Sequence, residues 1–245
     1  MIRLFRKIRF KLFVDNKVGK YLIYAIVEVL IVVIGILIAL QINNWNQQRL
    51  TEEKINRLFL EIRKNLVSEI ETAENVVEFY SIRDSIIQRV VDKKLTREEF
   101  ASPTINSPQY AIMVLRHFAF NRNAYDNLTK ISDKIPAKYD SLYGDLKILY
   151  DARGELIKER KSKLEAKYYP YQEYLRYNKE WTFDLLQFRE LDEDAIDYFI
   201  KDPFYFNQVI EIQDDIRKYK NAIYGYKTIA AGIIKQILEL ELKEY

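Results

Sequence analysis

Residues 21–40, YLIYAIVEVLIVVIGILIAL, form an apolar run of twenty residues with one charged side chain, Glu28. At about 1.5 Å rise per residue, such a run makes a helix of about 30 Å, the thickness of the hydrocarbon core of a bilayer. A cleaved signal peptide needs a shorter apolar centre and a small-residue cleavage site, which the following ALQIN does not provide. A buried core helix is usually shorter. We therefore expect an uncleaved transmembrane helix over residues 21–45.

The flanks of the run predict its orientation. Residues 1–20 contain seven basic residues and one acidic residue, whereas the twenty residues after Trp45 contain five basic residues. Because cytoplasmic flanks are enriched in Lys and Arg, we expect a cytoplasmic N-terminus and residues 46–245 on the far side. Tyr21, Tyr24 and Trp45 would then anchor the helix at the two membrane interfaces.

Residues 1–20 alternate bulky apolar and basic side chains. This pattern is typical of an amphipathic helix that lies on the cytoplasmic face of a membrane, although a merely charged tail remains an alternative. The apolar residues that would share one helical side are Leu4, Phe5, Ile8, Leu12 and Phe13.

Glu28 is unusual because an ionisable group in a membrane helix costs a few kcal/mol and should face protein, water or a partner. On a helical wheel it shares a face with Val32, Gly35 and Ala39. The small residues Gly35 and Ala39, four positions apart, let two helices approach closely. We expect this face to associate with another membrane helix. The alternatives are proton-coupled contact with another subunit, and a carboxyl group that is protonated or reaches the headgroups.

Composition limits the remaining possibilities. Residues 46–245 hold 32 basic and 34 acidic residues, so the basic character is confined to the N-terminus, which suits an anionic membrane surface and argues against nucleic-acid binding. The chain contains no cysteine, which excludes disulfides and thiol chemistry. Six glycines and five prolines are few for this length and favour long helices, so we expect an all-α fold in which the transmembrane helix continues into a bundle of long helices.

Two patterns predict the first part of the domain at residues 46–245. Apolar residues from Ile55 to Val91 recur at steps of mostly three or four, which indicates one amphipathic helix that can continue directly from the membrane. Thr96 and Glu99 then match a capping box at the start of a short helix.

Further helices follow. We expect a buried helix at 110–120, a long helix that Pro136 opens and Pro170 ends or bends, and a last helix that begins at Asp202-Pro203. The last helix has coiled-coil-like spacing and should pack at a shallow angle against the 55–91 helix or against a second copy of itself. Its predicted packing seam consists of Val209, Ile212, Ile216, Tyr219, Ile223, Tyr226, Ile233, Ile237 and Leu240.

The sequence contains no catalytic signature. The single histidine, His117, lies in the apolar segment at 110–120, where we expect it to pack rather than to bind a ligand. Metal-ligand spacings, Gly-rich phosphate loops and nucleophile elbows are missing from the sequence. The nineteen tyrosines are expected mainly in the core, with interfaces as the alternative. We therefore predict no enzymatic activity, no catalytic residue, no metal and no cofactor.

Three segments resemble a family of uncharacterised membrane proteins of the Bacteroidetes group: MIRLFRKIRFKLF at the N-terminus, the run KYLIYAIVEVLIVVIGILIALQINNWNQQR, and FAFNRNAYDNL at 118–128. Members resemble one another in an E-x-x-L-V-V-I-G-I-L-I-A-L-Q-I-N-N-W helix, in which Ile31 stands here for the first Leu, and tend towards P-N-R-G-A-Y-D-N-L, where Phe120 and Asn123 replace Pro and Gly. The resemblance implies a bacterial inner-membrane protein that faces the periplasm. It implies no activity.

The sequence supports three hypotheses of function. The first is a single-pass, membrane-anchored helical scaffold or interaction protein, a homo-oligomer or the partner of another envelope membrane protein. The second is an accessory subunit of an ion-driven or transport complex that uses Glu28. The third is a sensor with a periplasmic four-helix bundle, which is weakened because no second span or output domain follows in the sequence.

Overall fold

The computed structural model describes residues 17–240, with side chains from Gly19 onwards. Within that range the regular elements are α-, 3-10 and π-helices and no strand occurs, so the predicted all-α fold class is confirmed. The amphipathic helix predicted for residues 1–20, including Leu4, Phe5, Ile8, Leu12 and Phe13, lies outside the described residues except for its last four.

The chain divides into two compact units, Met1–Lys54 and Ile55–Tyr245, and helix α2 (Lys17–Val91) contributes to both. In the first unit the large apolar side chains from Tyr21 to Trp45 are exposed. Among the described residues, α2 is the one helix that is long and apolar enough to cross a membrane. This finding is compatible with a single-pass membrane protein. The domain boundaries predicted at residues 20 and 45 are the expected limits of the membrane span. The division into two units does not test these limits, so the boundaries stay predictions.

The second unit, Ile55–Tyr245, is built from helices of very different lengths. After α2 it contains α3 (Arg97–Ala101), η1 (Pro108–Tyr110), α4 (Asn123–Thr129), η2 (Ser132–Lys134), η3 (Ala137–Tyr139), α5 (Asp140–Lys147), the π-helical η4 (Ile148–Arg153), α6 (Gly154–Asn178), α7 (Thr182–Gln187), α8 (Glu193–Lys201) and α9 (Pro203–Glu239).

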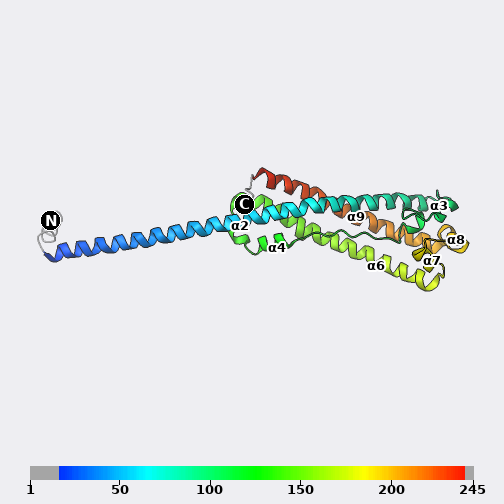
Figure 1. The fold of residues 1–245 in the computed structure, drawn as a ribbon, viewed down its shortest axis with the longest axis horizontal. Helices are drawn as coiled ribbons and strands as arrows, with labels where there is room; N and C mark the ends of the chain where they lie inside the picture. Colours follow the sequence, from blue (N-terminus) through cyan, green and yellow to red (C-terminus); the bar gives the residue numbers. More distant parts are fainter. Residues whose placement is uncertain (1–16, 241–245) are drawn as a thin grey trace, which may run out of the picture. The chain divides into compact units, whose positions relative to one another are not determined.

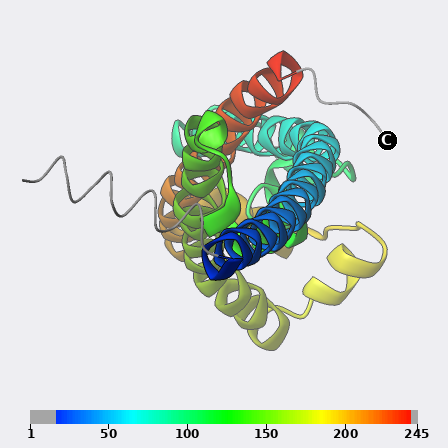
Figure 2. The ribbon, with the colours of Figure 1, turned by 90° about the vertical axis from the view of Figure 1, so that its left-hand side faces the viewer.

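Three long helices run lengthwise through the second unit: α6, α9 and the part of α2 that follows residue 54 (Figure 1). Helix α9 packs most closely against α6, and polar side chains join it to α2. The short helices α3, α7 and α8 gather at one end of this bundle, where α3 packs against α8 (Figure 1). Figure 2 shows the helices of the bundle end-on.

The stripe predicted between Ile55 and Val91 forms the inner face of α2. Its members Ile55, Ile62, Leu66 and Tyr80 are fully buried. The helix ends where Lys93 adopts a left-handed backbone conformation with φ of 54°. The predicted capping box follows: the Glu99 N–H donates to Thr96 Oγ1, and the Thr96 N–H donates to Glu99 Oε2.

The helix predicted at 110–120 is wrong. After η1 the chain makes turns at 111–113 and then runs without helix or strand from 114 to 122. Side chains of the long helices bond its backbone groups, so the segment needs no helix to satisfy them. His117 is exposed rather than packed in a core, and its Nε2 lies 3.6 Å from Glu165 Oε1.

The long helix predicted after Pro136 is present but interrupted. It begins with the 3-10 turn η3 and changes from α5 through the π-helical η4 into α6. Pro170 lies inside α6, which continues to Asn178. Of the two predicted effects of Pro170, the end of the helix is therefore wrong, and the bend stays a prediction. A proline inside a helix costs about 3 kcal/mol, because it removes a backbone hydrogen bond and its ring meets the preceding turn. Burial of Tyr171 and Leu175 in the following turns opposes that cost.

Helix α9 begins where the sequence predicts. The Asp202 carboxylate accepts a hydrogen bond from the Phe204 N–H at 2.8 Å, and Pro203 occupies the first turn. The predicted seam residues of α9 are buried inside the second unit, except that Leu240 is partly buried. The partner named from sequence was the 55–91 helix or a second copy. The 55–91 part of α2 does contact α9, with the Tyr80 and Tyr219 rings 5.6 Å apart between centroids. Helix α6 of the same chain packs more closely against α9 and was not predicted as its neighbour.

Candidate functional site

Residues 114–122, which we call the strap, run through the second unit and lead into α4 (Figure 1). No backbone–backbone hydrogen bond joins the strap to the described parts of α2, α6 or α9. Side chains of α2 and α9 instead bond backbone groups of the strap, including the buried Phe118.

Each of the three long helices holds the strap or the residue before it. From α2, the Tyr80 hydroxyl donates to the Arg116 carbonyl at 2.8 Å and accepts from the Arg116 N–H at 3.1 Å. From α9, the Tyr219 hydroxyl accepts from the Phe118 N–H at 2.9 Å. From α6, the Tyr168 hydroxyl donates to the Met113 carbonyl. Burial raises the pKa of the Tyr168 hydroxyl to about 12, so it stays protonated and able to donate.

Glu69 holds the end of the strap. This α2 side chain is buried, its Oε1 accepts from the Asn121 N–H at 2.7 Å, and its Oε2 accepts from the Tyr226 hydroxyl of α9 at 2.6 Å. Burial raises the pKa of the Glu69 carboxyl above its ordinary value of 4.5, and the two hydrogen bonds oppose that rise only in part. Burial likewise raises the pKa of Tyr226.

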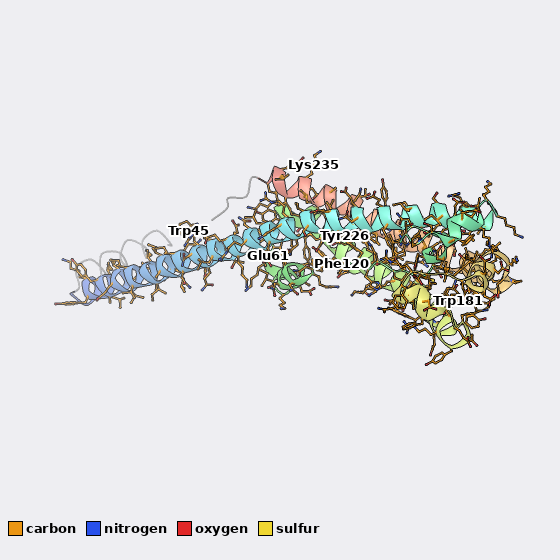
Figure 3. All side chains as sticks on the ribbon, turned by 45° about the vertical axis from the view of Figure 1, so that its right-hand side comes forward. Trp45, Glu61, Phe120, Trp181, Tyr226 and Lys235 are labelled. Carbon is orange, nitrogen blue, oxygen red and sulfur yellow. The ribbon has the colours of Figure 1, made fainter. Side chains whose placement is uncertain are left out.

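Aromatic rings surround this carboxyl group. The Phe120 ring lies 5.3 Å from the Tyr226 ring between centroids, and the two residues are labelled in Figure 3. Gly154 makes room for Phe120, because a Cβ atom at residue 154 would lie 2.7 Å from Phe120 Cζ. Gly154 follows the π-helical turn η4, which contributes the buried ring of Tyr150 beside Phe120.

The chemistry of this cluster is structural. A buried carboxyl group with a raised pKa is a feature of many catalytic sites. Here, however, both of its oxygens are occupied by the strap and by α9. Among the described residues, no group of His, Cys, Asp and Glu could hold a metal ion. We therefore assign Glu69 and the tyrosines to holding the strap in place.

An open groove lies between the start of the second unit on α2 and the end of α9. Its volume is about 680 Å³. Its floor is apolar, and two of the floor side chains, Val67 and Leu238, are 57% and 55% exposed. In Figure 3, Glu61 lies on the α2 side and Lys235 on the α9 side. The lining residues are Arg57, Leu60, Glu61, Arg63, Lys64, Val67, Ile234 and Leu238.

A second exposed apolar surface lies at α7. Trp181 and Leu185 anchor this short helix in the core, whereas Phe183 is 66% and Phe188 57% exposed. The two exposed rings meet edge to face with centroids 5.8 Å apart. Trp181 is labelled in Figure 3 at this end of the bundle.

The residues predicted to associate in the membrane remain unpartnered in the described structure. Glu28, Val32, Gly35 and Ala39 are exposed on α2, and a Cβ atom at Gly35 would have no neighbour within 4 Å. The predicted interface anchors are also exposed: Tyr21 by 74%, Tyr24 by 73% and Trp45 by 64%. Their roles at a membrane stay predictions.

Sequence reasoning missed the strap contacts and the groove. Glu69 left a signal, because it stands three residues after Leu66 and four before Ala73 and so falls on the apolar stripe of α2. A charged residue at a core position is a sign of a buried polar contact. The groove left a weaker signal, because Val67 and Leu238 lie off the stripes of their helices.

Over residues 17–240, these elements define an all-α fold with one helix long and apolar enough to cross a membrane and a helical bundle that holds the strap. Residues 28–137 match a family of unknown function, DUF6090, so the chain is similar to an uncharacterised domain family over this range. The matched range contains α2 from Glu28 onwards and the strap, whereas α6 and α9 lie beyond it. No curated protein and no solved structure matches the chain.

Proposed function

We propose that the protein is a membrane-anchored helical scaffold or interaction protein of the bacterial envelope. Residues 21–45 cross the inner membrane once, the N-terminus is cytoplasmic, and residues 46–245 lie in the periplasm. The exposed apolar stretch of α2 supports the anchor, and the resemblance to Bacteroidetes membrane proteins supports the envelope location.

The proposed interaction function rests on the groove between α2 and α9. Exposed apolar patches rimmed by polar residues mark sites of protein contact, and the groove has an apolar floor with charged residues around it. We further propose that the protein has no catalytic activity of its own; in support, both oxygens of the buried Glu69 carboxylate accept hydrogen bonds from the strap and from α9. The face of Glu28, Val32, Gly35 and Ala39 is proposed to join copies or partners within the membrane.

Single cysteines test the location and the interaction together, because the natural chain has none. We would label Tyr177→Cys and Val67→Cys in intact cells with an outer-membrane-permeant maleimide that does not cross the inner membrane. Tyr177 is 81% exposed and should react fully. Val67→Cys should react several-fold more slowly in cells than in purified protein, since a partner covers the groove. Two unreactive cysteines would contradict the periplasmic location, and equal rates at Val67→Cys in both preparations would contradict the occupied groove.

A second candidate, an accessory subunit of an ion-driven or transport complex, rests on Glu28. This carboxyl group lies within the apolar stretch and makes no hydrogen bond or ion pair with another described residue. Intramembrane ionisable residues often mark ion pathways. Replacing Glu28 by Gln should then abolish the activity of the complex and leave its assembly intact, whereas loss of assembly would favour the scaffold.

A further inference from the structure

The groove between α2 and α9 is long enough for a helix. On α2 it extends from Arg57 to Val67, which is about three helical turns or about 15 Å. On α9 it is lined by Ile234 and Leu238, one turn apart. Closer to α7 the two helices are bridged by side chains, among them Arg217 of α9 and Asp84 of α2 at 2.7 Å. The two helices are therefore bridged closer to α7 and are separated by the groove at Arg57–Val67 and Ile234–Leu238.

The spacing of the floor residues suits a helical ligand. Leu60 and Val67 are seven residues apart on α2, and Ile234 and Leu238 are four apart on α9. Side chains at these intervals form ridges on a helix surface, and another helix packs its own ridges between them. Amphipathic peptides that bind grooves use the same intervals of three, four and seven residues.

The charged residues around the groove favour a ligand of opposite charge. Arg57 and Lys64 are exposed and make no ion pair with any described residue, and Arg63 also lines the groove. Among the described lining residues, Glu61 is the one acidic side chain. This excess of positive charge is local, because residues 46–245 contain slightly more acidic than basic residues.

The same charges disfavour a second copy of the chain. Two chains anchored in one membrane would meet in parallel, and an in-register contact along this face would place Arg57 opposite Arg57 and Lys64 opposite Lys64. Like charges directly opposite each other are destabilising. A partner with acidic flanks would instead pair with the rim.

We propose that the groove binds an amphipathic helix of a different protein, with an apolar face on the groove floor and Asp or Glu residues opposite Arg57 and Lys64. This inference rests on the proposed interaction function and specifies the chemistry of the partner. The bound helix completes the open end of the bundle along α2 and α9.

Photo-crosslinking of the full-length chain in its own membranes tests the proposal. A benzoylphenylalanine residue that replaces Val67 or Leu238 should crosslink to another protein, and both positions should crosslink to the same one. Ile82 on α2 and Ile210 on α9 are matched controls, exposed by 39% and 54% and outside the groove, and should not give it. The crosslinked peptide, identified by mass spectrometry, should have apolar residues at helical spacing flanked by Asp and Glu.

Charge reversal supplies the second measurement. Arg57→Glu with Lys64→Glu should lower the crosslink yield from Val67 by about tenfold, and the wild-type yield should fall as salt rises. Lys158→Glu with Lys163→Glu on α6 keeps the same change in net charge and should have no effect. Far-UV circular dichroism would confirm that both double variants stay folded.

Several results would overturn the proposal. The crosslinked product could join two copies of the chain, or only lipid could be crosslinked. The control positions could give the same product as the groove positions, or the crosslink yield from Val67 could stay unchanged after charge reversal. The mass of the particle extracted in mild detergent then separates this inference from the proposed function. A mass above that of one chain supports the interaction function and contradicts only the acidic helical partner of the groove. A particle of one chain with no groove crosslink would contradict both.

Discussion

At the scale of single residues, Glu69 links three parts of the second unit. Its carboxylate oxygens accept hydrogen bonds from the strap and from α9, while its own backbone belongs to α2. Burial opposes the charged form of the group, and the two donors favour it. The pKa is raised because burial has the larger effect.

This raised pKa makes stability depend on pH. The folded state holds the Glu69 proton more tightly than the unfolded chain does, so its contribution is fully present below about pH 4.5 and is lost as pH rises through the folded-state pKa. Glu69→Gln cannot ionise. The stability of the variant relative to wild type should therefore increase between pH 4 and pH 8, measured by urea unfolding in detergent. A difference that stays constant over this range would contradict the assignment.

Gly154 tests the packing of Phe120. An alanine Cβ at residue 154 would lie 2.7 Å from Phe120 Cζ, so Gly154→Ala should destabilise the protein by about 1–3 kcal/mol through overpacking. Gly232 is the matched control on α9, where a Cβ atom would have no neighbour within 4 Å. Gly232→Ala should stabilise by up to about 1 kcal/mol through helix propensity. Equal effects of the two variants on the unfolding midpoint would argue against the close contact.

At the scale of elements, the strap shows where sequence reasoning reaches its limit. Leu115, Arg116 and Ala119 are good helix formers, and local propensity predicts a helix there. The hydroxyl groups that hold the extended backbone come from Tyr80 and Tyr219, which are far away in sequence. Their spacing along α2 and α9 indicates burial but does not say what their hydroxyl groups bind.

The strap contacts can be tested one hydroxyl at a time. Tyr219→Phe keeps the ring but removes the acceptor of the Phe118 N–H, which should cost about 1–3 kcal/mol as an unsatisfied buried donor. The Phe118 amide should also exchange faster with deuterium. Tyr224→Phe is the control, since Tyr224 is 57% exposed. Unchanged exchange at Phe118 in Tyr219→Phe would contradict the proposed attachment of the strap.

The helices that carry long periodic patterns were predictable. The stripe from Ile55 to Val91 and the start of α9 at Pro203 depend on local spacing and capping, and the sequence contains both signals. The sequence left open whether Pro170 ends or bends its helix. The helix does not end there, because a proline removes only one backbone hydrogen bond and buried residues before and after it oppose the loss. Of the two neighbours of α9, the 55–91 helix was predicted and α6 was missed, because periodicity shows which face is buried and not which helices cover it.

At the scale of the whole molecule, two features point to association. The first unit exposes an apolar stretch of membrane length with Gly35 and Ala39 on one predicted face. The second unit exposes a groove with an apolar floor and a basic rim. The first feature was predicted from sequence. The groove was not, because its walls come from segments separated by about 170 residues, between Val67 and Ile234.

The mass of the particle extracted in mild detergent from the native membrane tests this account most directly. The account predicts a protein mass, corrected for detergent, that exceeds one chain of 29.4 kDa. A whole multiple of that mass would assign the association to copies of this chain, and additional chains would identify partners of the groove or of the membrane helix. A stable particle of 29.4 kDa, in detergents that preserve other envelope complexes, would contradict the account.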